Sequence, residues 1–289
     1  MYSDVKSRCF VGEATTDWFD VDVGVRQGCV LSPILFNMFI NGLAEEVKSL
    51  GLGVKVDDGE DNLSILLYAD DICLIAENPR HLQRMLDAIS VYSSRWRFQI
   101  NLGKTAGVVF GMSWKKGQET RLWYKGRRVE MRDRYKYLGM IFHCNGTWKV
   151  EKKKMIRKAR RRVAAACSML TSVGVIAVKD GLATWKGLIR PTLEYGCEVW
   201  CDERDKTWEE AERVQTDMLR RILRCGTGMA GVAVRGELGV RKLSERRDML
   251  RLGFWNKVLS YTSHSWVRRV YMESRRRQVF FNEHNWCSV

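Results

Sequence analysis

The chain has 289 residues, is 45% hydrophobic, and carries 49 lysine and arginine residues against 34 acidic ones, for a formal net charge of +15. This apolar content excludes a disordered chain, and the length suggests about two domains. The excess of positive charge favours a polyanionic partner, nucleic acid first and an anionic membrane surface second.

The sequence offers no membrane segment and no complete zinc site. No apolar run approaches the ~18 residues of a spanning helix, and Met1–Phe10 holds no apolar segment of the secretory type. Cys197 and Cys201 lie four residues apart, but no second pair completes a zinc ligand set. We therefore expect an intracellular protein, nuclear or cytoplasmic, whose nine cysteines are reduced and mostly buried.

Helix and strand patterns alternate in the first half of the chain. Ser32 is expected to cap a helix with Pro33 in its first turn, because apolar residues then recur at helical spacing up to Val47. Asn78-Pro79 repeats this device before a second amphipathic helix, which ends near Trp96. Strand patterns lie at residues 63–69, 72–76, 98–102, 108–110, 122–124 and 135–142, with a hairpin turn at Lys125-Gly126.

The second half of the chain is predicted to be helical. Helical spacing covers residues 152–170, 180–200, 207–225 and 243–260. Pro191 is expected to kink or break the second of these helices, and Gly226 is expected to stop the third. The sequence therefore predicts an α+β fold, with a mixed domain over residues 1–145 and an all-helical domain over residues 146–289.

The most informative residues are Tyr68-Ala69-Asp70-Asp71. Adjacent carboxylates are costly inside a buried strand, where they would also point to opposite faces. At the tip of a hairpin both reach one site, where a divalent cation would relieve their repulsion, and hard oxygen ligands suit Mg²⁺ or Mn²⁺. An ordinary Asp-rich turn is the alternative, and the tetrapeptide alone does not decide between the two.

A second motif, Val-Arg-Gln-Gly-Cys-Val-Leu-Ser-Pro-Ile-Leu-Phe-Asn, occupies residues 25–37. In this order the two motifs resemble the reverse transcriptases of non-LTR retrotransposons, in which Gln-Gly followed by Leu-Ser-Pro opens a palm helix and a Tyr-Ala-Asp-Asp hairpin comes next. Residues 101–110 are similar to the family's next palm motif, and residues 137–139 to its primer-grip turn. Residues 195–200 and 220–223 resemble signatures of its helical region. The resemblance covers most of the chain, from about Cys9 to Leu259.

The resemblance implies an RNA-directed DNA polymerase, with a partial palm of antiparallel sheet and packed helices followed by a helical, thumb-like region. It makes Asp70 and Asp71 the metal-binding carboxylates of a two-metal nucleotidyl transfer that uses Mg²⁺ or Mn²⁺. The implied partners are an RNA template, a DNA primer and deoxynucleotides. Lys104 is either a catalytic residue that shields the departing pyrophosphate or a solvated loop lysine. The residues implied to bind template, primer or nucleotide are Gln27, Gly28, Tyr68, Tyr137, Leu138 and Gly139.

A basic run follows Trp148, with nine basic residues and one acidic residue between Lys149 and Arg162. Apolar residues recur at helical spacing from Met155 to Val163, so one face packs while the others carry charge. A solvated face is the usual fate of such a run, but here the acidic partners that normally balance it are nearly absent. We predict a helix that follows a nucleic-acid backbone. The residues predicted to bind nucleic acid are Lys152, Lys153, Lys154, Arg157, Lys158, Arg160 and Arg161.

One part of the family pattern has no counterpart. The family's third metal-binding aspartate lies on a strand upstream of the Gln-Gly motif, and no aspartate before Gln27 matches it. We therefore expect a truncated or decayed copy that is incomplete or inactive as an isolated chain. Its palm would leave an unpaired edge, open to self-association or to a partner chain.

Two alternatives stay open. One is a non-catalytic nucleic-acid-binding protein derived from a retroelement, which a magnesium-dependent activity would exclude. The other is a protein similar to the group II intron maturases, which a preference for intron RNA would favour.

Overall fold

The computed structural model describes residues 5–21, 24–26, 28–59, 61–172, 177–199 and 207–281. The chain forms two compact units: Met1–Asn101 with Leu122–Arg128, and Leu102–Arg121 with Val129–Val289. Residues 102–121 and 129–145 thus group with the later helices, and the division differs from the predicted boundary at residue 145. Helices and small sheets together confirm the α+β class, while the assignment of palm and thumb stays a prediction.

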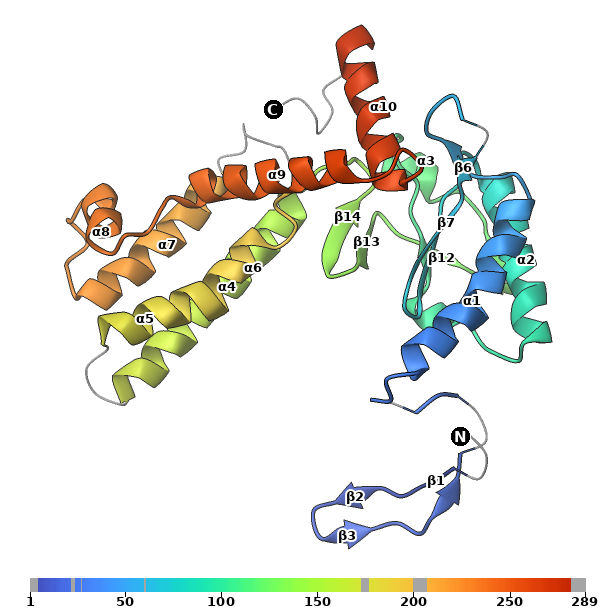
Figure 1. The fold of residues 1–289 in the computed structure, drawn as a ribbon, viewed down its shortest axis with the longest axis horizontal. Helices are drawn as coiled ribbons and strands as arrows, with labels where there is room; N and C mark the ends of the chain where they lie inside the picture. Colours follow the sequence, from blue (N-terminus) through green and yellow to red (C-terminus); the bar gives the residue numbers. More distant parts are fainter. Residues whose placement is uncertain are drawn as a thin grey trace. The chain divides into compact units, whose positions relative to one another are not determined.

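In the first unit two helices lie side by side, α1 (Ser32–Ser49) and α2 (Pro79–Arg95) (Figure 1). Helix α1 also packs against strand β7. The strands form antiparallel pairs: β1 (Lys6–Ser7) with β4 (Phe19–Asp20), β2 (Phe10–Val11) with β3 (Ala14–Thr15), β5 (Val54–Lys55) with β6 (Asn62–Leu63), β7 (Ile65–Tyr68) with β8 (Asp71–Leu74), and β10 (Trp123–Tyr124) with β11 (Arg127–Arg128). The core is apolar and includes Leu43, Val47, Ile65, Met85 and Ile89.

The two Pro-initiated helices begin differently. The Asn78 side chain accepts a hydrogen bond from the His81 N–H at 2.9 Å, which confirms the predicted cap of α2. The predicted Ser32 cap is wrong, because Leu31 is the N-cap of α1 and makes no side-chain cap bond. The Ser32 hydroxyl instead donates to the Arg26 carbonyl at 2.6 Å. This bond holds the chain that leads into α1.

The second unit contains short strands and most of the helices. Strand β9 (Ala106–Gly107) pairs in parallel with β12 (Glu130–Met131), and β13 (Arg134–Tyr137) pairs antiparallel with β14 (Met140–His143). The helical elements are η1 (Leu102–Lys104), α3 (Trp114–Gly117), α4 (Lys149–Ser172), α5 (Val178–Thr184), η2 (Trp185–Ile189), α6 (Arg190–Glu194), α7 (Thr207–Leu223), α8 (Gly231–Glu237), α9 (Leu243–Ser260) and α10 (Trp266–Phe281). Helix α4 packs along α7 and α6 around one core, in which Trp185, Ile189 and Met218 are fully buried (Figure 1).

The structure tests two predicted helix interruptions, at Pro191 and Gly226, and two predicted strands. Pro191 lies in the first turn of α6, and the five residues of η2 directly before α6 form a π-helix. The regular α-helix is therefore interrupted at this point, as expected, because proline has no N–H to donate. Helix α7 ends at Leu223 because Arg224 takes a left-handed φ of 54° and the Cys225 N–H bonds to the Arg220 carbonyl at 3.1 Å. Gly226 therefore lies past the stop. The strands predicted at 98–102 and 108–110 are wrong, because these residues form a loop and a 3₁₀ turn.

No helix in the described ranges combines the length and the apolar character that crossing a membrane requires.

Candidate functional site

The Tyr68-Ala69-Asp70-Asp71 segment is the tip of the β7–β8 hairpin in the first unit. Tyr68 pairs with Asp71, which leaves Ala69 and Asp70 as a two-residue turn. Ala69 has a φ of 50°, a left-handed conformation that costs an L-residue about 1–2 kcal/mol. Asp70 and Asp71 are both exposed, and Tyr68 is 64% exposed. The hairpin thus exposes both carboxylates and the Tyr68 ring near its tip, and the hairpin itself confirms the prediction from the sequence.

That Asp70 and Asp71 bind a hard divalent cation stays a prediction. Within the ranges that the structure describes, His, Cys, Asp and Glu side chains form no cluster of three or more that would hold a metal ion. The oxygen donors of Asp70 and Asp71 fit Mg²⁺ or Mn²⁺ in kind. A complete set therefore needs a further donor.

The Gln-Gly motif lies just before α1, in the same unit. Gly28 is exposed, has a φ of 81°, and has open space where a Cβ would stand. A turn bond from the Cys29 N–H to the Arg26 carbonyl (3.3 Å) shapes this segment. Gln27 lies outside the described residues. The left-handed φ gives a physical reason for a glycine here, and the contact of Gly28 with a ligand stays a prediction.

The predicted primer-grip residues form the tip of the β13–β14 hairpin in the second unit. Tyr137 pairs with Met140, so Leu138 and Gly139 make a two-residue turn with φ values of 46° and 85°. Positive φ at both positions is the signature of a type I′ turn, which matches the twist of the flanking strands. The Leu138 side chain is exposed at this tip.

Lys104 lies at the end of η1 in the second unit, with an exposed side chain. Its carbonyl accepts a hydrogen bond from the Tyr135 hydroxyl, which ties η1 to strand β13. Asp70 and Asp71 belong to the other unit. The catalytic role of Lys104 therefore stays a prediction.

Helix α4 sorts its basic residues into three groups, and the prediction for Lys152 needs correction. Lys152 is fully buried, with its ammonium 5.2 Å from the ring centroid of Trp208, so it is closed to a phosphate. Lys154 donates to the Gly139 carbonyl at 3.0 Å and to both carboxylate oxygens of Glu151 at 2.9 and 2.8 Å. Its ammonium is thus bound by groups of the protein, its side chain is 31% exposed, and its contact with nucleic acid stays a prediction.

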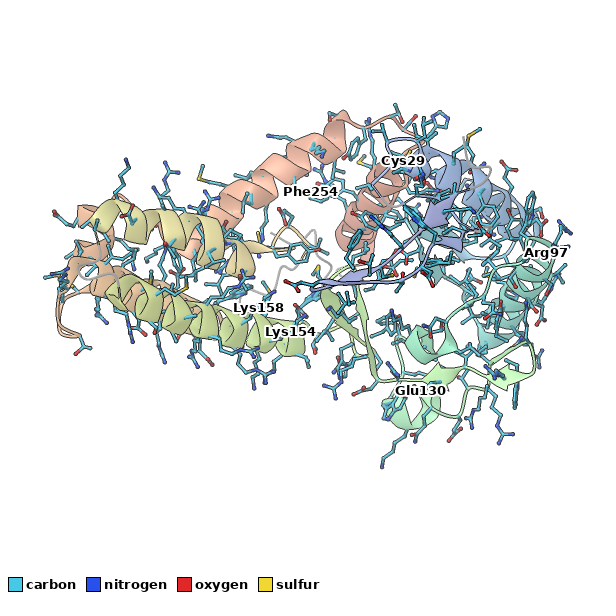
Figure 2. All side chains as sticks on the ribbon, turned by 90° about the horizontal axis from the view of Figure 1, so that it is seen from below. Cys29, Arg97, Glu130, Lys154, Lys158 and Phe254 are labelled. Carbon is cyan, nitrogen blue, oxygen red and sulfur yellow. The ribbon has the colours of Figure 1, made fainter. Side chains whose placement is uncertain are left out.

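The remaining predicted residues of α4 are exposed. Arg160 forms an ion pair with Glu210 at 3.2 Å. The others make an exposed basic stripe, in which three residues follow at a spacing of four and Lys158 lies three positions before Arg161. We define this basic stripe as Lys153, Arg157, Lys158 and Arg161. Figure 2 labels Lys154 and Lys158, one helical turn apart on α4.

Sequence reasoning missed the residues that hold the β13–β14 hairpin. The Tyr195 hydroxyl donates to the Leu138 carbonyl at 2.6 Å, and the Ile141 N–H donates to Glu151 at 2.8 Å. Tyr195 had been noted only as part of a family signature. Glu151 carried a usable signal, because it is the one acidic residue in a basic run and stands three positions before Lys154.

Both motifs lie in a part of the sequence that matches a known protein family. Residues 5–142, which include both motifs and both hairpin tips, match the family described as reverse transcriptase (RNA-dependent DNA polymerase). The chain thus resembles the reverse transcriptases of the non-LTR retrotransposon type, with the family match covering just under half of its residues. The RNA-directed DNA polymerase from mobile element jockey of Drosophila funebris is 25% identical over 262 residues, which cover 89% of this chain and 28% of that protein.

Two further relatives come from Drosophila melanogaster. The probable RNA-directed DNA polymerase from transposon X-element is 24% identical over 250 residues, covering 84% of this chain and 25% of that protein. The Pol polyprotein from the type-2 retrotransposable element R2DM is 33% identical over 137 residues, covering 43% of this chain and 12% of that protein. The chain thus spans about a quarter of the length of the jockey and X-element proteins.

Proposed function

We propose that the chain supplies the catalytic hairpin and a nucleic-acid grip of an RNA-directed DNA polymerase. The observation that carries the proposal is the exposed pair Asp70 and Asp71 on a two-residue turn, inside the segment that matches the family. These carboxylates would hold Mg²⁺ or Mn²⁺. When bound, such ions activate a primer 3′-hydroxyl and neutralise charge on the leaving pyrophosphate.

The other residues of the proposal bind and orient the substrates. Gly28 and Gln27 face the template and the incoming deoxynucleotide, and Tyr68 flanks the carboxylates. The Tyr137-Leu138-Gly139 turn contacts the DNA primer, and the basic stripe of α4 holds the primer–template duplex. Lys104 shields the departing pyrophosphate. We place this activity inside the cell, in the nucleus or the cytoplasm.

We further propose that a second segment or a partner chain completes the site. Two carboxylates hold a hard cation weakly, since ligand number and geometry set the affinity. Within the described ranges β7 and β8 pair only with each other, which leaves strand edges open. The start of α1 also exposes apolar side chains, which suit a partner surface. They are Leu31, Ile34, Leu35 and Met38. The isolated chain should therefore extend primers poorly.

Primer extension and Mn²⁺ binding test the proposal together. We would compare the chain with its Asp70→Asn and Asp71→Asn variants, and with Asp87→Asn as a matched surface control on α2. Weak Mn²⁺ binding, measured by electron paramagnetic resonance, should vanish in the two hairpin variants and persist in the control. Any extension of a DNA primer on an RNA template should follow the same pattern. Equal Mn²⁺ binding in all four proteins, or measurable extension that is equal in all four, would contradict the proposal.

A non-catalytic nucleic-acid-binding protein is the second candidate function. The basic stripe favours it, because the stripe belongs to the second unit and needs no carboxylate hairpin. Salt-sensitive duplex binding without Mn²⁺ binding at Asp70 and Asp71 would select this candidate.

A further inference from the structure

The tip of the β13–β14 hairpin is held by side chains from two other elements. The Tyr195 hydroxyl, just after α6, donates to the Leu138 carbonyl at 2.6 Å. The Lys154 ammonium, on α4, donates to the Gly139 carbonyl at 3.0 Å. Both carbonyls of the two-residue turn are therefore taken by donors from outside the hairpin.

Helix α4 fastens the same hairpin at a second point. Glu151 is 2% exposed, and its carboxylate accepts from the Ile141 N–H on β14 at 2.8 Å. The same carboxylate pairs with Lys154 at 2.8 and 2.9 Å. Because a buried carboxylate is stable only when paired and hydrogen-bonded, Glu151 and Lys154 hold each other in place against the hairpin.

The turn needs this support because its backbone is strained and its underside is not packed. Leu138 has a φ of 46°, which a residue with a Cβ rarely adopts. A cavity of about 570 Å³ lies between the hairpin and the end of α6, lined by Leu138, Met140, Pro191 and Tyr195 among others. Met140, directly after the turn, and Phe142 join the core of the unit, and the Tyr195 hydroxyl, from the lining of this cavity, bonds to the tip.

Gly139 fits the same arrangement. A Cβ at this position would lie 3.4 Å from ring atoms of Tyr195, and its φ of 85° is also left-handed. A Cβ at 3.4 Å would make an ordinary contact with Tyr195, so the left-handed φ is the reason for a glycine at this position.

We propose that Tyr195, Lys154 and Glu151 are positioning residues that fix the Leu138-Gly139 turn relative to α4. We name these three residues the turn clamp. The clamp fixes the position of the turn relative to the basic stripe on the same helix. A primer strand whose duplex is bound by the stripe therefore contacts the turn at a fixed position. This inference rests on the proposed function, in which the turn contacts the primer strand. It adds that Lys154 acts on the turn and not on a phosphate.

Two measurements on the full chain separate the clamp from the primer contact. Hydrogen exchange of residues 134–143 reports how firmly the hairpin is held. Binding is compared for two RNA–DNA duplexes, one with a recessed primer 3′ end and one whose primer end is closed by a loop. The variants are Tyr195→Phe and Lys154→Met, with Lys154→Arg as the conservative replacement. Tyr271→Phe, which loses a hydroxyl bonded to Trp255 elsewhere in the unit, is the control.

We expect Tyr195→Phe to speed exchange at the hairpin tip roughly five-fold, the effect of one lost hydrogen bond. The preference for the recessed end should fall by a similar factor, while the salt dependence of binding stays unchanged. Lys154→Met should act in the same way, Lys154→Arg should recover most of the effect, and Tyr271→Phe should leave the tip unaltered.

Each other outcome has a definite meaning. Unchanged exchange in Tyr195→Phe and Lys154→Met overturns the clamp. Equal acceleration in Tyr271→Phe also overturns it, because the effect would then be a general loss of stability. Faster exchange in the clamp variants, with no preference for recessed ends even in the unmodified chain, supports the clamp and refutes the primer contact proposed for the turn.

Discussion

Lys152, Lys153 and Lys154 are neighbours in the sequence but have three different environments. Lys152 is buried beside Trp208, Lys153 is exposed, and Lys154 is bound to Glu151 and the hairpin. Successive residues on a helix point about 100° apart, so a uniform basic run cannot behave uniformly. The sequence contains a sign that Lys152 is buried. Lys152 lies three residues before Met155 and four before Ile156, on the side of the helix that the apolar spacing predicts to face the core, and both apolar residues are buried.

Cysteine reactivity provides a prediction at the same scale. Burial, with smaller contributions from Glu198 and Glu194, raises the pKa of Cys197 from 9.0 to about 12. Because the thiolate is the reactive form, alkylation of Cys197 near pH 8 should be about a thousand-fold slower than for an ordinary thiol. Cys9 is exposed and should react first. Mass spectrometry of peptides after timed iodoacetamide treatment measures both rates. Similar labelling of the two cysteines in the folded chain would contradict the burial of Cys197.

Among the contacts between helices α1 and α2 is a close approach that a sequence pattern does not show. The Tyr92 hydroxyl of α2 donates to the Phe39 carbonyl at 2.7 Å. A Cβ on Gly42 would lie 2.8 Å from that hydroxyl oxygen, too close for a real contact. Gly42 is thus a packing residue within a helix, a position where glycine is otherwise unfavourable by about 1 kcal/mol relative to alanine.

We expect Gly42→Ala to destabilise the first unit by about 1 kcal/mol or more, although alanine is the better helix former. The added methyl group displaces the Tyr92 hydroxyl, and the loss of its hydrogen bond to Phe39 outweighs the gain in helix propensity. Urea unfolding followed by hydrogen exchange in α1 and α2 measures the change.

The Tyr92→Phe background provides the matched control. Without the hydroxyl the methyl group has room, so Gly42→Ala should there be neutral or stabilising. Equal destabilisation in both backgrounds would show that the contact with Tyr92 is not the cause.

Elements defined by local chemistry were predictable, and those defined by distant partners were not. The α2 cap at Asn78 and the interruption at Pro191 follow from side chains within a few residues, and both are confirmed. The hydroxyl of Ser32 finds a backbone acceptor upstream of its helix, which no capping pattern encodes. The tip at Leu138 depends on Tyr195, 57 residues away. The acidic hairpin was found because its residues are adjacent, whereas the turn clamp joins three segments.

At the scale of the whole molecule, the net charge of +15 is informative only together with its placement. Of the seven basic residues of α4 predicted to bind nucleic acid, Lys152 is buried, Lys154 is bound to Glu151 and the hairpin, and Arg160 is paired with Glu210. The four residues of the basic stripe remain exposed on one side of the helix. Electrostatic binding depends on such local clusters, because screening limits each charge to about 10 Å at ordinary ionic strength. The stripe should therefore matter more than the same number of charges placed elsewhere.

Salt-dependent binding tests this conclusion with two fourfold variants of equal net charge. One neutralises the basic stripe by Lys153→Gln, Arg157→Gln, Lys158→Gln and Arg161→Gln. The other changes four exposed lysines outside the stripe to glutamine, namely Lys48, Lys179, Lys242 and Lys257. On duplex DNA each phosphate contact contributes about 0.9 to the slope of log affinity against log salt, so the stripe variant should lose about 3 to 4 in slope. The control should keep nearly the parent slope, measured by fluorescence anisotropy from about 50 to 200 mM salt. If both variants lost slope equally, the total charge and not the α4 stripe would govern binding, and α4 would have no special part in holding the duplex.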